Sequence, residues 1–368
     1  MRLVAIVAVA LLVAGCCREG NQAETAREGA AGRAPAPPAL LPPFVEGISE
    51  KPWSCRTIIQ EDVNTIRERV CWKSGDLQII GQVCRPRREG RFPVVVYGHA
   101  QLLGLGAEWQ GGPCQAIAAD GNVVLMPSFR GQDGSEGKVE GCAGEVDDAL
   151  AMLDMGLAQP YADGQRTAWA GISHGGCVAL KALARGTQSR AAVALFPAVD
   201  WTAIYTHWDA KSREPGPPAL AQLYKTGSTE LVKAFGGPPS THAAEYQRRS
   251  VLAADLEKNP TPLFLVHGTS DAIIPAATTC KLAAGLTGTT AFRLTPKGDP
   301  ATEIAPGCDD AKLTPQTAGS ALIPKTARLV GLYEGGQHDI TSLEGQRMAR
   351  DGYAFIKARL APSATPPK

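Results

Sequence analysis

Several common features are scarce or missing in this 368-residue sequence, and each absence narrows the possible functions. There is no Cys-x-x-Cys motif and no paired-histidine spacing, so a zinc site is not expected. The 37 basic residues nearly balance the 36 acidic ones, which gives no indication of nucleic-acid binding. Internal repeats and heptads are missing, and there is no second long apolar run after the N-terminal one. We therefore expect no metal, no cofactor and no nucleic-acid partner, and the 44% apolar content allows a sizeable core.

One stretch, residues 168–180, has the form of a strand, a tight turn and a helix. It contains Gly171-x-Ser173-x-Gly175, with a short apolar run before it and a helix-compatible run after it. A serine on such a turn takes strained backbone geometry, and its neighbours must be glycine because a side chain there would collide with an adjacent strand or helix. The pattern predicts a nucleophilic Ser173 hydroxyl that stands clear of the sheet, with helix amides behind it. The alternative is a glycine-rich turn that happens to hold a serine.

A serine hydroxyl becomes a good nucleophile only when a base takes its proton and a carboxylate orients that base. Histidine is scarce, with six residues, so the base can be sought by elimination. His338 follows a short predicted strand, residues 329–333, that ends in a glycine loop, and from such a loop an imidazole can reach over the serine turn. The other histidines lie in apolar strand-like runs or in an irregular middle segment: His99, His174, His267, His207 and His242. We therefore predict His338 as the base, the alternative being an ordinary loop histidine.

The predicted acid is Asp271, which ends a turn after the apolar strand of residues 262–267. Asp255 precedes the same strand and is expected at its opposite end, on the wrong side of a parallel sheet. Asp339 adjoins the histidine, and a neighbour in sequence points its side chain away from its partner. A turn-capping aspartate is the alternative reading of Asp271.

Taken together, these motifs resemble the α/β-hydrolases, whose catalytic residues follow the chain order Ser, Asp, His. The most similar branch is that of prolyl oligopeptidases and dienelactone hydrolases. The resemblance runs from about residue 92 to about residue 360 and rests on motifs at residues 92–101, 127–131, 171–175, 267–275 and 335–339. It implies an α/β-hydrolase fold and acyl-transfer chemistry.

The predicted elements agree with that fold class. Strands and helices alternate along the chain, which indicates a mostly parallel sheet with helices on both faces. The expected strands are residues 94–97, 123–126 and 192–196, the expected helices are residues 109–120 and 145–159, and a hairpin of residues 67–72 and 77–84 is expected at a sheet edge. We predict one catalytic domain, residues 44–362, followed by a disordered tail at residues 363–368.

Residues 200–250 break this rhythm, with proline and glycine runs around two helical pieces at residues 219–225 and 229–235. We expect a small helical cap inserted over the site, the part of such enzymes that shapes substrate choice. Three aromatic residues near its start either line an apolar acyl pocket or join the cap to the core: Trp201, Tyr205 and Trp208.

The resemblance also implies an oxyanion hole made of two backbone amides. One is the amide of His174, which follows the nucleophile. The other follows the strand before His99, where His99-Ala100-Gln101 stands in place of the family's His-Gly-x and indicates Gln101. His99 is expected to be a structural residue at the end of that strand, and Arg130 is expected to brace the top of the sheet.

The N-terminal residues 1–15 hold one arginine followed by a continuous apolar run that is too short to span a bilayer, a pattern typical of a secretion signal. Val13-Ala14-Gly15-Cys16 resembles the lipobox of bacterial lipoproteins, which implies cleavage before Cys16 and acylation of its thiol. Cys17, rather than aspartate, follows it and favours the outer membrane. Residues 16–43 are rich in Ala, Gly and Pro and are predicted to form a flexible tether. An ordinary signal peptide, which would leave the protein periplasmic or secreted, is the alternative.

Eight further cysteines follow Cys16 and Cys17, and an even number in an exported protein suggests disulfides. Sequence alone cannot choose among the many pairings. Cys114 and Cys142 have the same separation as Cys280 and Cys308, and each pair would tie a helix to a nearby loop, so we favour these two. Cys177, on the inner face of the helix after Ser173, is expected to be a buried free thiol.

The resulting prediction is an exported, membrane-tethered serine hydrolase that cleaves carboxylic esters through an acyl-enzyme formed on Ser173. The expected partners are a small ester or peptide substrate and a lipid membrane. One alternative is a serine peptidase or amidase of the prolyl-oligopeptidase type. Such peptidases usually carry a β-propeller or a long N-terminal domain, whereas only residues 44–91 are available for one here. A catalytically silent hydrolase fold that serves as a binding module is the other alternative.

Overall fold

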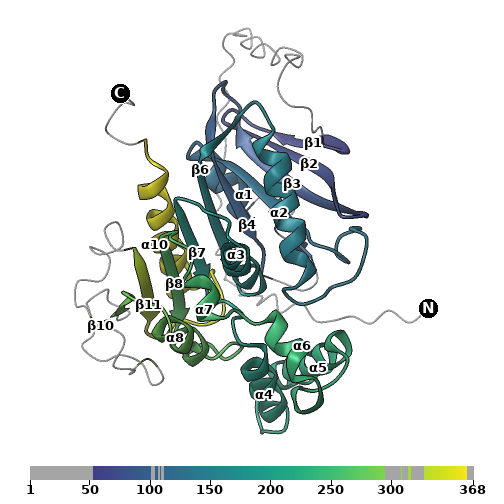
Figure 1. Ribbon diagram of the computed structural model, residues 1–368, viewed down its shortest axis with the longest axis vertical. Helices are drawn as coiled ribbons and strands as arrows, with labels where there is room; N and C mark the ends of the chain where they lie inside the picture. The colour runs from purple at the N-terminus through teal and green to yellow at the C-terminus, as the bar shows by residue number, and fades with distance from the viewer. Residues whose placement is uncertain are drawn as a thin grey trace, which may run out of the picture.

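A computed structural model describes residues 53–100, 104–106, 108, 112–294, 308, 314–315 and 327–362 of the chain (Figure 1). Residues 1–52 and 363–368 lie outside these ranges. The predicted signal, the acylated Cys16, the tether and the disordered tail therefore stay predictions. Gln101, expected in the oxyanion hole, also lies outside the described residues.

The described strands form one sheet in the order β1-β2-β3-β5-β4-β6-β7-β8-β11-β9-β10. The first part is antiparallel through β3 and β5, and from β5 onward all neighbours are parallel. The strands are β1 Cys55–Glu61, β2 Thr65–Ser74, β3 Leu77–Pro86, β4 Phe92–Gly98, β5 Val123–Pro127, β6 Ala162–Ile172, β7 Ala191–Leu195, β8 Leu263–Gly268, β9 Thr290–Leu294, β10 Thr314–Pro315 and β11 Arg328–Tyr333.

Helices cover both faces of this sheet, as the alternating pattern predicts. They are α1 Gly112–Ala119, α2 Gly144–Leu157, α3 His174–Ala184, α4 Trp201–Lys211, α5 Pro218–Phe235, α6 Pro239–Arg249, α7 Ala253–Leu256, α8 Ala276–Ala284 and α10 Leu343–Leu360. Alternate residues of a strand point to opposite faces. Accordingly, Val94 and Val96 of β4 join the core cluster under α2 and α3, whereas Val95 and Tyr97 join the cluster under α1 and α10. The α/β-hydrolase fold class is confirmed.

The predicted hairpin is present as β2 and β3, but it does not lie at the edge of the sheet. β1 pairs antiparallel with β2 on its outer side. Its sequence, CRTIIQE, lacks a regular apolar alternation because nearly all of its residues are exposed, so periodicity gives little signal for this strand. The prediction that the hairpin is an edge was therefore wrong.

Four helices lie between β7 and β8 in the chain, and the first three of them, α4, α5 and α6, gather beside one end of the sheet (Figure 1). We call these three helices the cap. The two short helical pieces predicted around Gly227 are a single helix, α5. Glycine is normally unfavourable inside a helix. Here a Cβ on Gly227 would lie 2.6 Å from the Trp208 ring, so the glycine makes room for α4 to pack against α5.

All eight cysteines of the described residues form disulfides: Cys55–Cys71, Cys84–Cys114, Cys142–Cys177 and Cys280–Cys308. The Cys280–Cys308 prediction is confirmed. The Cys114–Cys142 pairing and the free Cys177 thiol were wrong, because β3 lies beside α1 whereas Cys142 precedes α2, which packs on α3. Equal spacing of cysteines in the sequence does not indicate which elements are neighbours in the fold.

Within the described ranges, no helix has both the length and the apolar character that crossing a bilayer requires.

Candidate active site

Ser173 lies on a sharp turn between β6 and α3. Its backbone has φ 54° and ψ −114°, a positive-φ conformation that is costly for a residue with a side chain. The turn is fixed by its surroundings, since the Ser173 amide donates to the carbonyl of Leu195 on β7. The strained geometry predicted from the glycine pattern is present.

The glycines around Ser173 permit contacts between backbones that no side chain would allow. A Cβ on Gly175 would lie 2.1 Å from the carbonyl carbon of Gly98, at the end of β4. A Cβ on Gly171 would lie 2.2 Å from the carbonyl oxygen of Gly175. The start of α3 is thus pressed directly against two strand ends, and this contact holds the serine in place.

His338 lies in the loop between β11 and α10 and contacts the serine. Its Nε2 is 2.9 Å from Ser173 Oγ and its Nδ1 is 2.7 Å from Asp271 Oδ2. A carboxylate only accepts hydrogen bonds, so Nδ1 carries the proton of the neutral ring and Nε2 accepts from the serine hydroxyl. The ring of Phe196, at φ 35°, packs against the imidazole with ring centroids 4.5 Å apart. The three residues predicted from sequence are therefore brought together.

The Asp271 carboxylate is fully buried and has several donors. Its Oδ1 accepts from the backbone amides of Ile273 and Ile274, at 2.9 and 2.8 Å. Burial alone would raise the pKa of this carboxyl, but His338 and the hydrogen bonds from His267 and His338 outweigh it and hold the pKa well below its ordinary value. Asp271 is thus ionised and fixed in orientation.

His267 is a second histidine on the same carboxylate. Its Nε2 lies 3.1 Å from Asp271 Oδ2 and 2.9 Å from the carbonyl oxygen of Ile274, while its Nδ1 is 2.8 Å from Thr279 Oγ1. Because both groups facing Nε2 only accept, Nε2 carries the proton. The sequence placed His267 only in an apolar, strand-like run and did not indicate this contact. The available signal was its position four residues before Asp271.

The two aspartates that the sequence analysis rejected as the acid, Asp255 and Asp339, have other partners in the structure. Asp255 lies in α7 and pairs with the exposed Lys258. The Asp339 carboxylate accepts from the amides of Thr341 and Ser342 and so caps the turn before α10. The sequence-based choice of Asp271 agrees with this placement.

The His174 amide is the first of α3, and the first amides of a helix have no partner within it. This amide is therefore free of a helical partner and can donate a hydrogen bond to a negative charge that develops beside Ser173. The His174 side chain points away, into a buried group in which the Phe129 ring packs between the rings of His99 and His174. Burial lowers the pKa of both histidines, to about 3 for His99. His99 is structural, as expected, since its carbonyl accepts from the Gly175 amide.

Arg130 braces the loop after β5, as predicted. Its guanidinium pairs with Asp148 of α2 at 2.8 Å and with Glu140 at 2.9 Å. Of the three cap aromatics, Trp201 is buried in the core beneath the cap. Trp208 donates from Nε1 to the carbonyl of Ile273, two residues after the acid. Trp208 thus joins the cap to the core.

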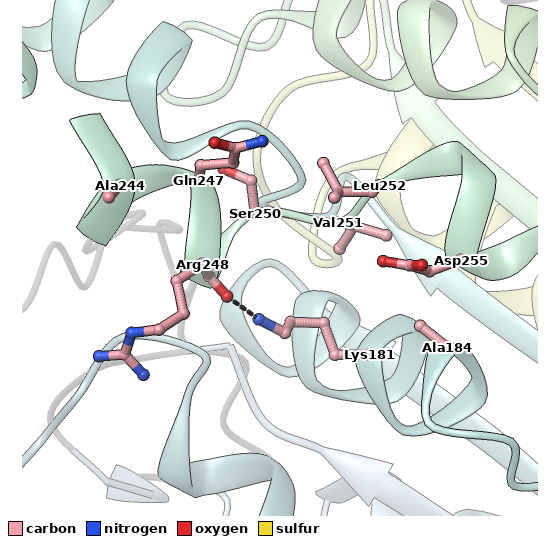
Figure 2. Close-up of a pocket in the computed structure, with 9 residues that line it drawn as sticks. All are labelled: Lys181, Ala184, Ala244, Gln247, Arg248, Ser250, Val251, Leu252 and Asp255. Carbon is pink, nitrogen blue, oxygen red and sulfur yellow. Dashed lines mark hydrogen bonds between the residues drawn. The ribbon is translucent and has the colours of Figure 1, made fainter.

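A cavity of about 370 Å³ lies beneath the cap, between α3 and α6 (Figure 2). Lys181 reaches across it to donate to the backbone carbonyl of Arg248, while the Arg248 guanidinium points away (Figure 2). Burial and the nearby Arg185, Arg248 and Arg249 lower the pKa of Lys181 to about 8. The nine lining residues include neither the serine, the acid nor the base, so this cavity is separate from the site.

A second cavity of about 540 Å³ shares the lining residues Gln247, Ser250, Val251 and Leu252 with the first. Both cavities lie beside the place where the chain enters the cap before α4 and leaves it after α6, and there the two connecting segments run side by side. There the Val251 amide donates to the carbonyl of Val199 at 2.9 Å.

Comparison with known proteins gives a consistent result. A family model described as the prolyl oligopeptidase family matches residues 113–296, half of the chain, which include Ser173 and Asp271. A Bacillus subtilis protein named uncharacterized peptidase YtmA is 25% identical over 203 residues, covering 55% of this chain and 72% of that protein.

Solved structures share the fold at low sequence identity. An acylaminoacyl peptidase from Pyrococcus horikoshii has a TM-score of 0.54 and 19% identity, and the match covers 80% of this chain. It covers only 41% of the peptidase, so the chain spans well under half of that protein's length. An esterase from Pyrococcus furiosus has a TM-score of 0.53 and 16% identity, and the match covers 80% of this chain and 91% of the esterase.

Proposed function

Because the chain belongs to the prolyl oligopeptidase family and is a serine hydrolase, we propose that Ser173, His338 and Asp271 are its catalytic residues and that carboxylic esters are its substrates. The observation that carries the proposal is the continuous hydrogen-bonded chain from Ser173 Oγ through both nitrogens of His338 to Asp271. This order of groups converts a hydroxyl into a nucleophile.

In the first half of the proposed reaction, Ser173 Oγ attacks the acyl carbon of the ester and its proton passes to His338 Nε2. The oxyanion that forms accepts from the His174 amide at the start of α3. The bond from carbon to the leaving oxygen then breaks, and His338 returns its proton to the departing alkoxide. The products at this stage are an alcohol and an acyl-enzyme.

In the second half, a water molecule takes the place of the alcohol. His338 removes one of its protons while the oxygen attacks the acyl carbon, and the Ser173 oxygen then leaves and regains that proton. Asp271 stays ionised throughout and stabilises the positive imidazole that forms in each half. The low pKa of Asp271 is what this role requires.

Two observations favour esters over peptides. The described residues ahead of β4 form strands β1, β2 and β3, which join the same sheet and do not make a separate gating domain. The esterase neighbour is matched over 91% of its length, whereas the acylaminoacyl peptidase is matched over 41%. A peptidase or amidase remains the second candidate, because the family and its curated relative carry peptidase names.

The test is a panel of nitrophenyl esters of graded acyl length beside aminoacyl nitroanilides, run on the wild type and on Ser173→Ala. We expect ester turnover and covalent labelling by a fluorophosphonate in the wild type. Loss of the nucleophile should lower kcat by about 10⁴-fold or more and stop labelling. Faster cleavage of the nitroanilides would favour the peptidase, and full labelling of Ser173→Ala would move the nucleophile elsewhere.

The proposal includes export, because four disulfides are typical of an oxidising compartment. The same probe tests it when applied to separated cell fractions. We expect the labelled protein in the membrane fraction, and its release to the soluble fraction when Cys16 is changed to Ser. Labelled protein in the cytosol would refute export.

A further inference from the structure

The acid turn, residues 271–274, consists of a carboxylate held by the peptide groups that follow it. Asp271 Oδ1 accepts from two amides, those of Ile273 and Ile274. Each amide belongs to a peptide group whose other end is the carbonyl of the preceding residue, Ala272 or Ile273. The orientation of the carboxylate therefore depends on how these two peptide groups are held.

Side chains of the cap hold the carbonyl ends of both peptide groups. The Ala272 carbonyl accepts from His207 Nε2 at 2.8 Å and from the Tyr224 hydroxyl at 2.7 Å. The Ile273 carbonyl accepts from Trp208 Nε1 at 2.7 Å. These donors come from α4 and α5, which lie far from Asp271 in the sequence.

The three donors are themselves fixed by packing within the cap. Tyr224 is buried, and its ring meets the His207 ring edge to face with centroids 5.7 Å apart. Trp208 occupies the space that Gly227 leaves open on α5. Because packing fixes the positions of these donors, their hydrogen bonds can set the positions of the two peptide groups.

A peptide group that accepts at its carbonyl is a stronger donor at its N–H, since linked hydrogen bonds polarise one another. Each of the two peptide groups accepts a hydrogen bond from the cap at its carbonyl and donates one to Asp271 from its N–H, so the cap bonds and the Asp271 bonds are linked in this way. We infer that Tyr224, Trp208 and His207 are positioning residues that act on catalysis through Asp271, so that the cap helps to align the catalytic acid. This inference rests on the proposed function.

The alternative is that these residues only attach the cap to the core. Attachment predicts a loss of stability, or a change in substrate binding, that is independent of Asp271. Positioning predicts a fall in kcat that disappears once the carboxylate is gone. The two can be separated by experiment.

The test compares Tyr224→Phe, Trp208→Phe and the double variant with a matched control, Tyr246→Phe. The Tyr246 hydroxyl also donates to a backbone carbonyl, that of Gly237, but both lie within the cap. We expect each single variant to lower kcat about three- to tenfold, the range set by one hydrogen bond, with little change in KM. The double variant should lose more, and Tyr246→Phe should keep the wild-type kcat even if its thermal stability falls equally.

A double-mutant cycle then asks whether the effect passes through the acid. In an Asp271→Asn background, Tyr224→Phe should lower the rate of fluorophosphonate labelling no further, because coupled residues are not additive. An equal loss in both backgrounds would overturn the inference, as would a control variant that loses as much as Tyr224→Phe.

A readout without substrate separates this inference from the proposed function. The proton on His338 Nδ1 that bonds Asp271 can be followed as a low-field resonance by NMR. We expect it to shift or broaden in the Trp208→Phe, Tyr224→Phe double variant and to be unchanged in Tyr246→Phe. An unchanged resonance in the double variant would overturn the inference, whatever the enzyme hydrolyses.

Discussion

The turn between β6 and α3 that carries Ser173, which we call the nucleophile turn, and the acid turn lie at the carboxyl ends of β6 and β8, with β7 between these two strands. The two turns are held by different means. Around Ser173 the backbone is fixed by direct contact between Gly175 and Gly98, with no side chain involved. Around Asp271 the backbone is fixed by side-chain hydrogen bonds from the core and from the cap. Steric contact of this kind fails all at once, whereas a set of hydrogen bonds weakens one bond at a time. Substitutions in the two turns should therefore differ in kind.

The largest effect is expected at the nucleophile turn, from Gly175→Ala. The new methyl group would overlap the backbone of β4, which cannot move without breaking the sheet, so folding itself should fail or lose about 3 kcal/mol or more. Soluble yield and thermal unfolding measure this. Gly216→Ala is the matched control, because a methyl group there meets open space and should leave stability unchanged or slightly higher. A Gly175→Ala protein as stable as the control would show that the close contact does not hold the turn.

At the acid turn, Asp271→Asn should leave a folded protein with kcat lowered by about 10⁴-fold. The amide keeps the shape of the carboxylate but loses the charge that stabilises the positive imidazole. Steady-state kinetics on a nitrophenyl ester measure the loss. Asp255→Asn, which changes an acid of α7 that pairs with the exposed Lys258, should have no effect. Near-normal activity in Asp271→Asn together with loss in Asp255→Asn would reverse the assignment.

A smaller effect is expected from His267→Asn, which removes one of the donors to the Asp271 carboxylate. A hydrogen bond to a charged group is worth about 1.5–3 kcal/mol, so kcat should fall about tenfold or somewhat more. A Thr279→Val control, which removes only the partner of His267 Nδ1, should lose less. A His267→Asn kcat equal to the wild type would show that the second histidine does not act on the acid.

The same variant has a consequence for stability in acid. A carboxyl whose pKa is lowered by folding stabilises the protein above its unfolded pKa of about 3.9, and this contribution is lost as pH falls toward the folded pKa. Without His267 the pKa of Asp271 should move up toward its ordinary value, so less stability is contributed at neutral pH. The midpoint of acid unfolding should then lie at higher pH in His267→Asn than in the wild type.

The sequence by itself specified the elements whose signal is local. Gly171, Ser173 and Gly175 predict a strained strand-to-helix turn because the steric constraint lies within five residues. The alternation of strands and helices predicts the parallel sheet, and Asp271 and His338 are predicted as the acid and the base because each follows a predicted strand in the expected chain order. These inferences need no knowledge of which distant segments touch.

Whatever depends on distant neighbours was decided only by the tertiary structure. The pairing of β1 with β2, the Cys142–Cys177 disulfide and the continuity of α5 through Gly227 each depend on a partner elsewhere in the chain. The same is true of the cap donors, because nothing near Tyr224 in the sequence indicates that its hydroxyl meets the Ala272 carbonyl. Local steric constraints depend only on adjacent residues and can be recognised in the sequence. Hydrogen bonds and disulfides between remote segments depend on which surfaces meet, and the packing of the core decides that.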